Sequence, residues 1–134
     1  MAATFPLQIV SPASLVFEGA VALVEVPGVE GDFGVLPGHA PFFSMIRPGV
    51  VTIHDGAAKQ KWFVTGGYAD VSPEGTTILS DDVRPLAKLT LADALASIEQ
   101  ATELGLNAQT DAERARATKL RDAAEAMVQA VKAA

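Results

Sequence analysis

The sequence contains no cysteine and no long apolar run. The absence of cysteine among 134 residues excludes disulfides, thiolate metal sites and cysteine nucleophiles. No uninterrupted apolar stretch approaches the roughly 20 residues that a helix needs to span a bilayer. If the protein works at a membrane, other subunits must therefore hold it there.

Basic residues are also scarce. The chain has 10 Lys and Arg against 16 Asp and Glu, which gives a net charge of −6. This balance argues against a nucleic-acid surface and against an electrostatic anchor on anionic lipid. The first basic residue is Arg47, so no positively charged segment precedes an apolar run, as it does in a secretory signal peptide. The composition predicts no nucleic-acid partner and no direct insertion into a membrane.

A glycine- and proline-rich stretch from Gly28 to Pro41 organises the chain. Glycines at this density supply backbone angles that other residues resist, and prolines fix φ and withhold N–H donors. The pattern predicts a shaped loop, with a short extended piece at Phe33–Leu36, that presents something to a partner or ligand. The repeat Gly28-x-x-Gly31-x-x-Gly34 resembles a phosphate loop only superficially, because no Lys-Ser/Thr follows it and it opens no helix.

Short strands are expected on both sides of this stretch. Phe5, Leu7 and Ile9 alternate with their neighbours in the first. A break is expected at Glu18-Gly19, and Asp55-Gly56 indicates a hairpin loop somewhat longer than two residues. Further strands are predicted at Leu15–Phe17, Ala20–Val26, Phe42–Ile46, Val50–His54, Lys59–Thr65, Tyr68–Ser72 and Thr76–Leu79. Such regular short strands favour a β-sandwich or flattened barrel, in which one of Trp62 and Phe63 lies in the core.

From Thr90 onward the periodicity becomes helical. Thr90 and Asp93 form a variant capping box, Gly105 and Asn107 are stop signals, and Thr110 to Glu113 is a fuller capping box. One stripe of the first helix is predicted to hold Leu91, Leu95, Ile98, Thr102, Ala94 and Ala101. One face of the second is predicted to hold Leu120, Ala124, Met127, Val128 and Val131.

We therefore expect an α+β protein with two domains, an antiparallel β-sandwich over residues 1–86 and an antiparallel helical hairpin over 87–134. The stripes of the hairpin are rich in alanine. Since alanine buries little apolar area, at roughly 25 cal/mol per Å², the hairpin has little energy with which to dock on a sandwich. We expect it to be detachable.

Three interpretations remain open for Glu30, Asp32 and His39. As a catalytic or metal site they would supply a carboxylate–imidazole pair or ligands, but no third clustered ligand is visible, since His54 lies at a strand end. Alternatively, His39 caps a turn and the acids face water. The interpretation that we favour is a loop that contacts another protein.

The second predicted helix carries a basic side made of Arg114, Arg116, Lys119 and Arg121. It is either a solvated face, because acidic residues are interspersed, or a docking site for an acidic loop of a partner. The first helix carries only acidic charges, so pairing across the hairpin is also available, at about 0 to 1 kcal/mol for each exposed pair.

Over nearly its whole length the chain resembles the ε subunit of F-type (rotary) ATP synthases. The resemblance rests on Val10-Ser11, the gap-free segment Glu30–Pro41, Arg47-Pro48-Gly49, and Gly66-Gly67. It implies about ten strands in the sandwich, no catalytic residues, no cofactor and no metal. The implied partners are the γ subunit and the c-ring of the membrane sector, with the β subunits of the catalytic hexamer as a further option.

The resemblance also implies roles for particular residues. Glu30, Gly31 and Asp32 would face the c-ring loops, and Ser11, His39 and Ser44 would lie on the side facing γ. The subunit would couple rotation of the ring, driven by protons or by sodium ions, to ATP synthesis, as a peripheral protein at the cytoplasmic face of the bacterial inner membrane. The competing hypothesis is a stand-alone β-sandwich binding module.

In this family the hairpin can extend and hinder ATP hydrolysis, so Arg114, Arg116, Lys119 and Arg121 are candidates for a regulatory contact. Some members bind ATP at the hairpin through an Ile/Leu-Asp-x-x-Arg-Ala motif. Here Thr90 stands where the Asp would be and Asp93 where the Arg would be. Because an anion replaces a phosphate-binding cation, we predict no strong ATP site.

Overall fold

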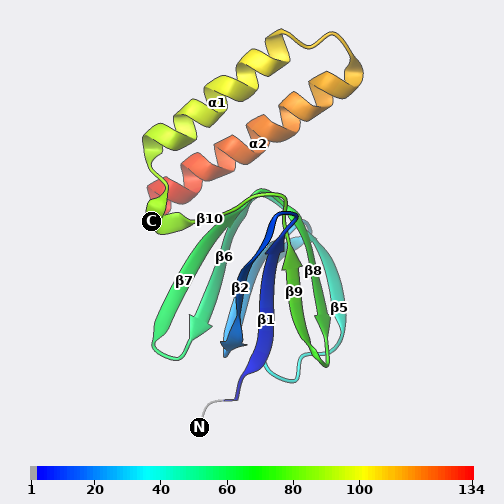
Figure 1. Cartoon of the computed structure of the whole chain (residues 1–134), viewed down its shortest axis with the longest axis vertical. Coiled ribbons are helices and arrows are strands. Elements are labelled where there is room, and N and C mark those ends of the chain that lie inside the picture. The colour runs from blue at the N-terminus through cyan, green and yellow to red at the C-terminus, as the bar shows by residue number, and fades with distance from the viewer. Residues whose placement is uncertain (1–2) are drawn as a thin grey trace. The chain divides into compact units, whose positions relative to one another are not determined.

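The computed structural model describes residues 3–134, which form two compact units. The first unit ends at Pro85 and the second begins at Leu86. The first is a β-sandwich and the second is a pair of helices (Figure 1). The α+β fold expected from the sequence is confirmed.

The sandwich unit has two layers. The strands pair in the order β10-β7-β6-β3-β5-β8-β9-β1-β2, and β4 pairs with β3. Only Gly28 and Ile46 pair between β3 and β5, so the sheet turns there from one layer into the other. In the described residues the strands are β1 (Phe5–Ser11), β2 (Ser14–Val21), β3 (Leu23–Gly28), β4 (Gly31–Val35), β5 (Phe42–Ile46), β6 (Gly49–Asp55), β7 (Ala58–Val64), β8 (Gly67–Ser72), β9 (Gly75–Leu79) and β10 (Val83–Pro85).

The core lies between the two layers and follows from the alternation along each strand. Leu7 and Ile9 of β1 and Ile53 of β6 are fully buried, while the residues between them are more exposed. Trp62 of β7 is partly buried and packs against this core. Phe63 points to the opposite face of β7 and is also buried, so neither of the two aromatic side chains lies open at the surface.

The expected break at Glu18-Gly19 is wrong. Strand β2 passes through both residues, because Glu18 pairs with Gln8 and Gly19 pairs with Leu7 in an unbroken ladder. The chain instead turns at Ala22, whose N–H donates a hydrogen bond to the His54 carbonyl at 2.9 Å. A glycine that keeps an extended conformation does not end a strand.

Three other features differ from the expected strands. Asp55 pairs with Ala58, so the turn between β6 and β7 contains two residues rather than more. Its first residue, Gly56, has φ +65°, which suits a tight hairpin turn. The pairing of β1 with β9 is parallel within an otherwise antiparallel sandwich. Strand β10 was not predicted, since three residues carry no detectable alternation.

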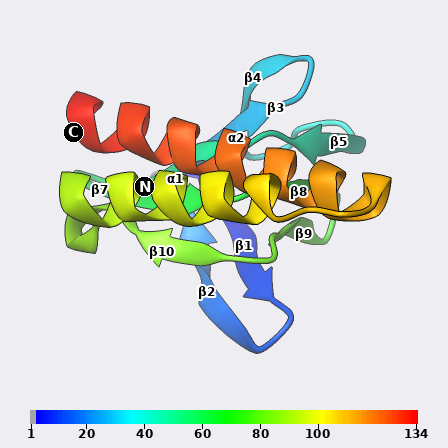
Figure 2. The ribbon, with the colours of Figure 1, turned by 90° about the horizontal axis from the view of Figure 1, so that it is seen from above.

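Two β-hairpins extend from the sandwich. Figure 2 shows the β1–β2 hairpin and the β3–β4 hairpin projecting in opposite directions. The turn and second strand of the β3–β4 hairpin come from the glycine- and proline-rich stretch from Gly28 to Pro41. This turn is exposed at Val29 to Asp32, as a contact element requires.

The helical unit contains α1 (Leu91–Leu106) and α2 (Asp111–Ala133), preceded by a 3₁₀ turn η1 (Leu86–Lys88). The capping box of α1 is complete, because the side chains and backbone N–H groups of Thr90 and Asp93 bond reciprocally at 3.1 Å. In α2 the box is shifted: the Thr110 hydroxyl accepts from the Glu113 N–H, but the Glu113 carboxylate accepts from Gln109.

The packed stripe of α1 differs from the expected one. Ala94 and Ala101 are buried, whereas Leu91 and Leu95 are 40% and 51% exposed. Gly105 was expected to stop the helix in a left-handed conformation, but it lies inside α1. A Cβ at this position would be 3.6 Å from the Ala117 Cβ. Small residues let the two helix backbones approach closely, and this pushes the leucines to the edge of the interface.

Replacing Gly105 with alanine is expected to stabilise the hairpin. The new methyl group meets Ala117 at an ordinary van der Waals distance, and alanine is favoured over glycine inside a helix by about 0.5–1 kcal/mol. Amide hydrogen exchange in α1 should slow by about twofold to fivefold. Ala96→Gly, at an exposed position of the same helix, should have the opposite effect. Faster exchange in Gly105→Ala would show that the helices cannot accept the methyl group.

Candidate functional site

The tip of the β3–β4 hairpin forms an acidic turn, defined here as Val29 to Asp32. The structure brings the three residues that the resemblance assigned to the c-ring together at this tip, and all three are exposed. Gly31 has φ +137°, and a Cβ on Gly28 would lie 2.6 Å from the Gly31 carbonyl oxygen. The turn therefore needs glycine at both positions that close it.

Arg47 holds this turn to strand β5. Its backbone N–H donates to the Pro27 carbonyl at 2.9 Å, its Nη1 donates to the Gly28 carbonyl at 2.5 Å, and its Nη2 pairs with the Asp32 carboxylate. The Val29 N–H donates to the Met45 carbonyl at 2.9 Å. The sequence showed that Arg47 is the first basic residue, but nothing in its local pattern indicated a contact 15 positions away.

The residues assigned to the γ-facing side lie in two places. Ser44 lies in β5, and His39 lies in the loop before it. The ring centroid of His39 is 6.4 Å from that of Phe42. Nδ1 of His39 lies 2.8 Å from the Ala40 carbonyl oxygen, and the Ser44 hydroxyl donates to the Met45 carbonyl. Ser11 lies at the end of β1, and its hydroxyl donates to the Ser14 carbonyl.

An apolar row crosses the outer face of the second layer and connects these two places. Its members are direct cross-strand partners from five adjacent strands, and the pairing sets them on one face. Phe43 lies beside the row, with its ring centroid 5.3 Å from that of Tyr68. The row consists of Met45, Tyr68, Leu79, Val10 and Leu15.

The two ends of this row, and Phe43 beside it, are exposed, and the three residues between the ends are partly exposed. Phe43, Met45 and Leu15 are 59%, 54% and 51% exposed, although each is large and apolar. A contiguous group of exposed apolar side chains usually marks a surface that another protein covers. Sequence reasoning missed the row, because its members are adjacent only through the strand register.

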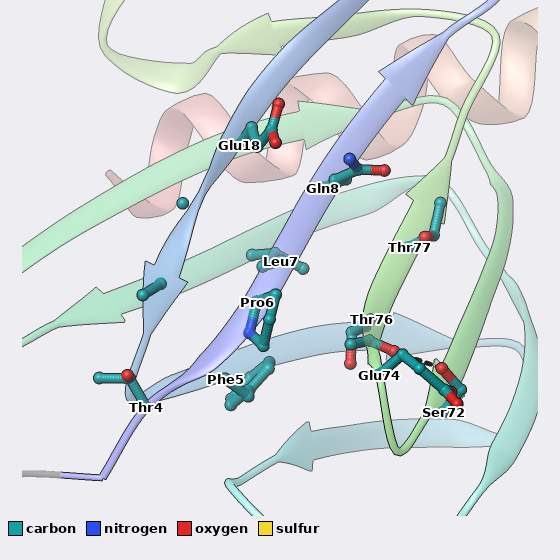
Figure 3. A pocket seen from close by; sticks show the side chains of 13 residues that line it. Thr4, Phe5, Pro6, Leu7, Gln8, Glu18, Ser72, Glu74, Thr76 and Thr77 are labelled. Carbon is teal, nitrogen blue, oxygen red and sulfur yellow. Dashed lines mark hydrogen bonds between the residues drawn. The ribbon is translucent and has the colours of Figure 1, made fainter.

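A groove of about 470 Å³ lies next to the apolar row on the same layer, over β1, β2 and β9. Figure 3 shows Gln8, Glu18 and Thr77 on neighbouring strands of its lining and Glu74 at one end. Its lining includes two acidic side chains and no basic one. No residue of the groove was a candidate site residue in the sequence analysis.

Of the four basic residues that the sequence analysis assigned to one side of α2, two form ion pairs. Arg114 pairs with Asp111 at 2.6 Å, and Arg121 pairs with Glu125 at 3.1 Å. Within residues 3–134, Arg116 and Lys119 form no ion pair. Three positions apart, these two lie on one side of α2 and are the members of the four that are available to an external partner.

No group of three His, Asp or Glu side chains in the described part of the chain is arranged to hold a metal ion. Of the three residues considered for such a site, Asp32 pairs with Arg47, and Glu30 and His39 are exposed.

At the position of the family's ATP motif, the side chains of Thr90 and Asp93 bond to each other's backbone as the cap of α1. No helix among residues 3–134 is both long enough and apolar enough to cross a membrane.

Comparison with known proteins gives one consistent family. The model of the ATP synthase delta/epsilon chain β-sandwich domain matches residues 4–85. The ATP synthase epsilon chain of Paramagnetospirillum magneticum is 42% identical over 132 residues, which cover 98% of this chain and 99% of that protein. ATP synthase epsilon chain 1 of Nitrobacter hamburgensis is 51% identical over 100 residues, covering 72% of this chain and 74% of that protein.

The fold is also found in a solved assembly. A chain in the cryo-EM structure of the Euglena gracilis mitochondrial ATP synthase, which contains OSCP, F1 and the c-ring, matches with a TM-score of 0.79 at 21% identity. The match covers 96% of this chain and 82% of that one. The family match extends over the sandwich, and the match to the relative from Paramagnetospirillum includes the hairpin. The chain therefore belongs to the epsilon chain family of ATP synthases.

Proposed function

We propose that this chain is a non-catalytic subunit of the central stalk, which couples rotation of the c-ring through γ to the catalytic hexamer. The observation that carries the proposal is the exposed apolar row on the outer face of the sandwich, in a chain that belongs to the epsilon family. A two-layer sandwich with a continuous core suits the role, because a close-packed interior deforms little under torque.

The proposed γ contact is the apolar row together with Phe43. Ser44 adjoins Met45 in the sequence and Ser11 adjoins Val10, but side chains alternate along a strand, and Ser44, opposite the buried Ala69, faces away from the row. Both serines are included in the proposed contact on the family resemblance. His39 lies against Phe42 in the loop before β5. An interface of this kind would have an apolar centre and a polar rim, which is typical of protein–protein contacts.

The proposed c-ring contact is the acidic turn at the tip of the β3–β4 hairpin, with Glu30, Gly31 and Asp32. It is supported by the exposure of these residues and by the hydrogen bonds that tie the turn to β5. Its carboxylates suit a ring whose loops carry basic groups. The ring would hold the subunit at the cytoplasmic face of the membrane.

The proposed regulatory contact is on the hairpin. Among Arg114, Arg116, Lys119 and Arg121, the two residues that form no ion pair in the described part of the chain, Arg116 and Lys119, are the better candidates for an acidic loop of the β subunits. The other two already have carboxylate partners within α2, which weakens their attraction to an external anion.

Co-purification tests the proposal. We expect the tagged chain, expressed in its own cells, to bring down γ and the catalytic hexamer, and a version ending at Lys88 to do the same, because the sandwich forms a compact unit by itself. Hydrolysis of ATP by the two complexes then measures any inhibition by the hairpin. Recovery of the full chain without γ or the hexamer would contradict the proposal and favour the stand-alone binding module.

A further inference from the structure

We infer that Arg47 is a positioning residue for the acidic turn, and that by neutralising Asp32 it leaves Glu30 as the acid that meets a cationic partner. This inference rests on the proposed c-ring contact and concerns how the turn makes it. The β3 side of the turn is bonded to β5 through backbone groups, whereas β4, on its other side, pairs with β3 alone among the described strands. A strand held by one neighbour gains from further support.

Arg47 provides that support from one side chain and one backbone group. Its guanidinium reaches the Gly28 carbonyl before the turn and the Asp32 carboxylate after it. The planar fork of arginine binds two acceptors at once, which neither lysine nor glutamine can do with the same geometry. Together with the backbone bond to Pro27, these contacts fix both ends of the turn to the end of β5.

The charges of the turn are unequal as a result. The Asp32 carboxylate is paired with Arg47, whereas the exposed Glu30 forms no ion pair within residues 3–134. Lys59 is the next basic residue along the chain, and it lies in β7, which does not pair with β3, β4 or β5. A basic group on the ring therefore meets one available carboxylate, that of Glu30. The ion pair between Asp32 and Arg47 holds the turn that carries it.

Hydrogen exchange in the full-length chain tests the positioning role without any partner. In Arg47→Gln the Val29 amide, which donates to Met45, should exchange about fivefold faster, the upper limit for loss of an exposed ion pair. Asp32→Asn should give a smaller change in the same direction, because the Arg47 bond to the Gly28 carbonyl remains, and the double variant should not exceed Arg47→Gln. Glu30→Gln should leave this amide unchanged.

A matched control is available in the same sandwich. Arg84 has a similarly exposed side chain and pairs with Asp82 at 3.1 Å, so Arg84→Gln removes a comparable ion pair far from the turn in sequence. It should not change exchange at Val29. The Ser80 amide, which donates to the Val10 carbonyl, serves as an internal reference in the variants of Arg47, Asp32 and Glu30. Unchanged Val29 exchange in Arg47→Gln would overturn the inference, whatever the effect on coupling.

Proton pumping per ATP hydrolysed, measured in the assembled synthase, tests the assignment of charge. Glu30→Gln should lower this ratio by about twofold to fivefold with the turn intact, and Arg47→Gln should lower it by loosening the turn. Faster Val29 exchange with normal coupling in Arg47→Gln would refute the proposed ring contact while retaining the structural role of Arg47. Normal coupling in Glu30→Gln alone would overturn the assignment of the charge to Glu30.

Discussion

Replacing Gly67 with alanine is expected to destabilise the sandwich by about 3 kcal/mol or more. Gly67 has φ +130°, and a Cβ at this position would lie 1.8 Å from the Leu79 carbonyl oxygen. Strained backbone angles cost about 1–3 kcal/mol each, and here the overlap with the backbone of β9 adds to that cost. Since β8 lies between β5 and β9, relief of the overlap must separate strands at the centre of one layer.

Urea denaturation monitored by tryptophan fluorescence measures this effect. Trp62 is the only tryptophan, and it packs against the sandwich core, so its signal reports on that unit. Gly19→Ala is the matched control, because its Cβ would touch only the Phe17 ring, at 3.4 Å, and its φ is not in the left-handed region. It should cost less than about 1 kcal/mol. Equal unfolding free energies for the two variants would contradict the expected strain at Gly67.

The sequence predicts best what depends on neighbouring residues. The alternation of Phe5, Leu7 and Ile9 specified both β1 and its buried face, and the spacing of Thr90 and Asp93 specified the start of α1. Glu30, Gly31 and Asp32 are contiguous, so a local motif sufficed to place them in one turn. In each case the physical cause acts within a few residues of the pattern that reveals it.

What the sequence did not predict depends on partners that are distant along the chain. Gly19 was expected to break a strand because glycine is flexible, but pairing with Leu7 keeps it extended. Leu91 and Leu95 share a periodic stripe with the alanines, yet close helix approach favours the smaller residues. The contact of Arg47 with Asp32 depends on strand register, which a single sequence does not specify.

Replacing Phe43 and Met45 together with glutamine is expected to weaken binding to γ by about thirtyfold or more. Both side chains are more than half exposed, so the free chain should lose little stability. An aromatic anchor at the centre of an interface often contributes about 2 kcal/mol or more, which corresponds to that change in affinity. A neutral amide is preferable to a carboxylate, because Phe43 lies directly opposite Asp70 in the adjacent strand and like charges there would repel.

The measurement is the affinity of the full-length chain for purified γ, with the urea midpoint of each variant as the test of folding. Leu106→Gln is the control: Leu106 is a large apolar side chain that is 82% exposed, but it lies in α1, outside the sandwich. It should bind γ as the unmodified chain does. If the double variant keeps full affinity, or if Leu106→Gln loses as much, γ does not bind through the apolar row. The exposure of Phe43 and Met45 would then indicate a different partner. Burying a contiguous apolar surface lowers the free energy, so such a surface is usually covered by another molecule.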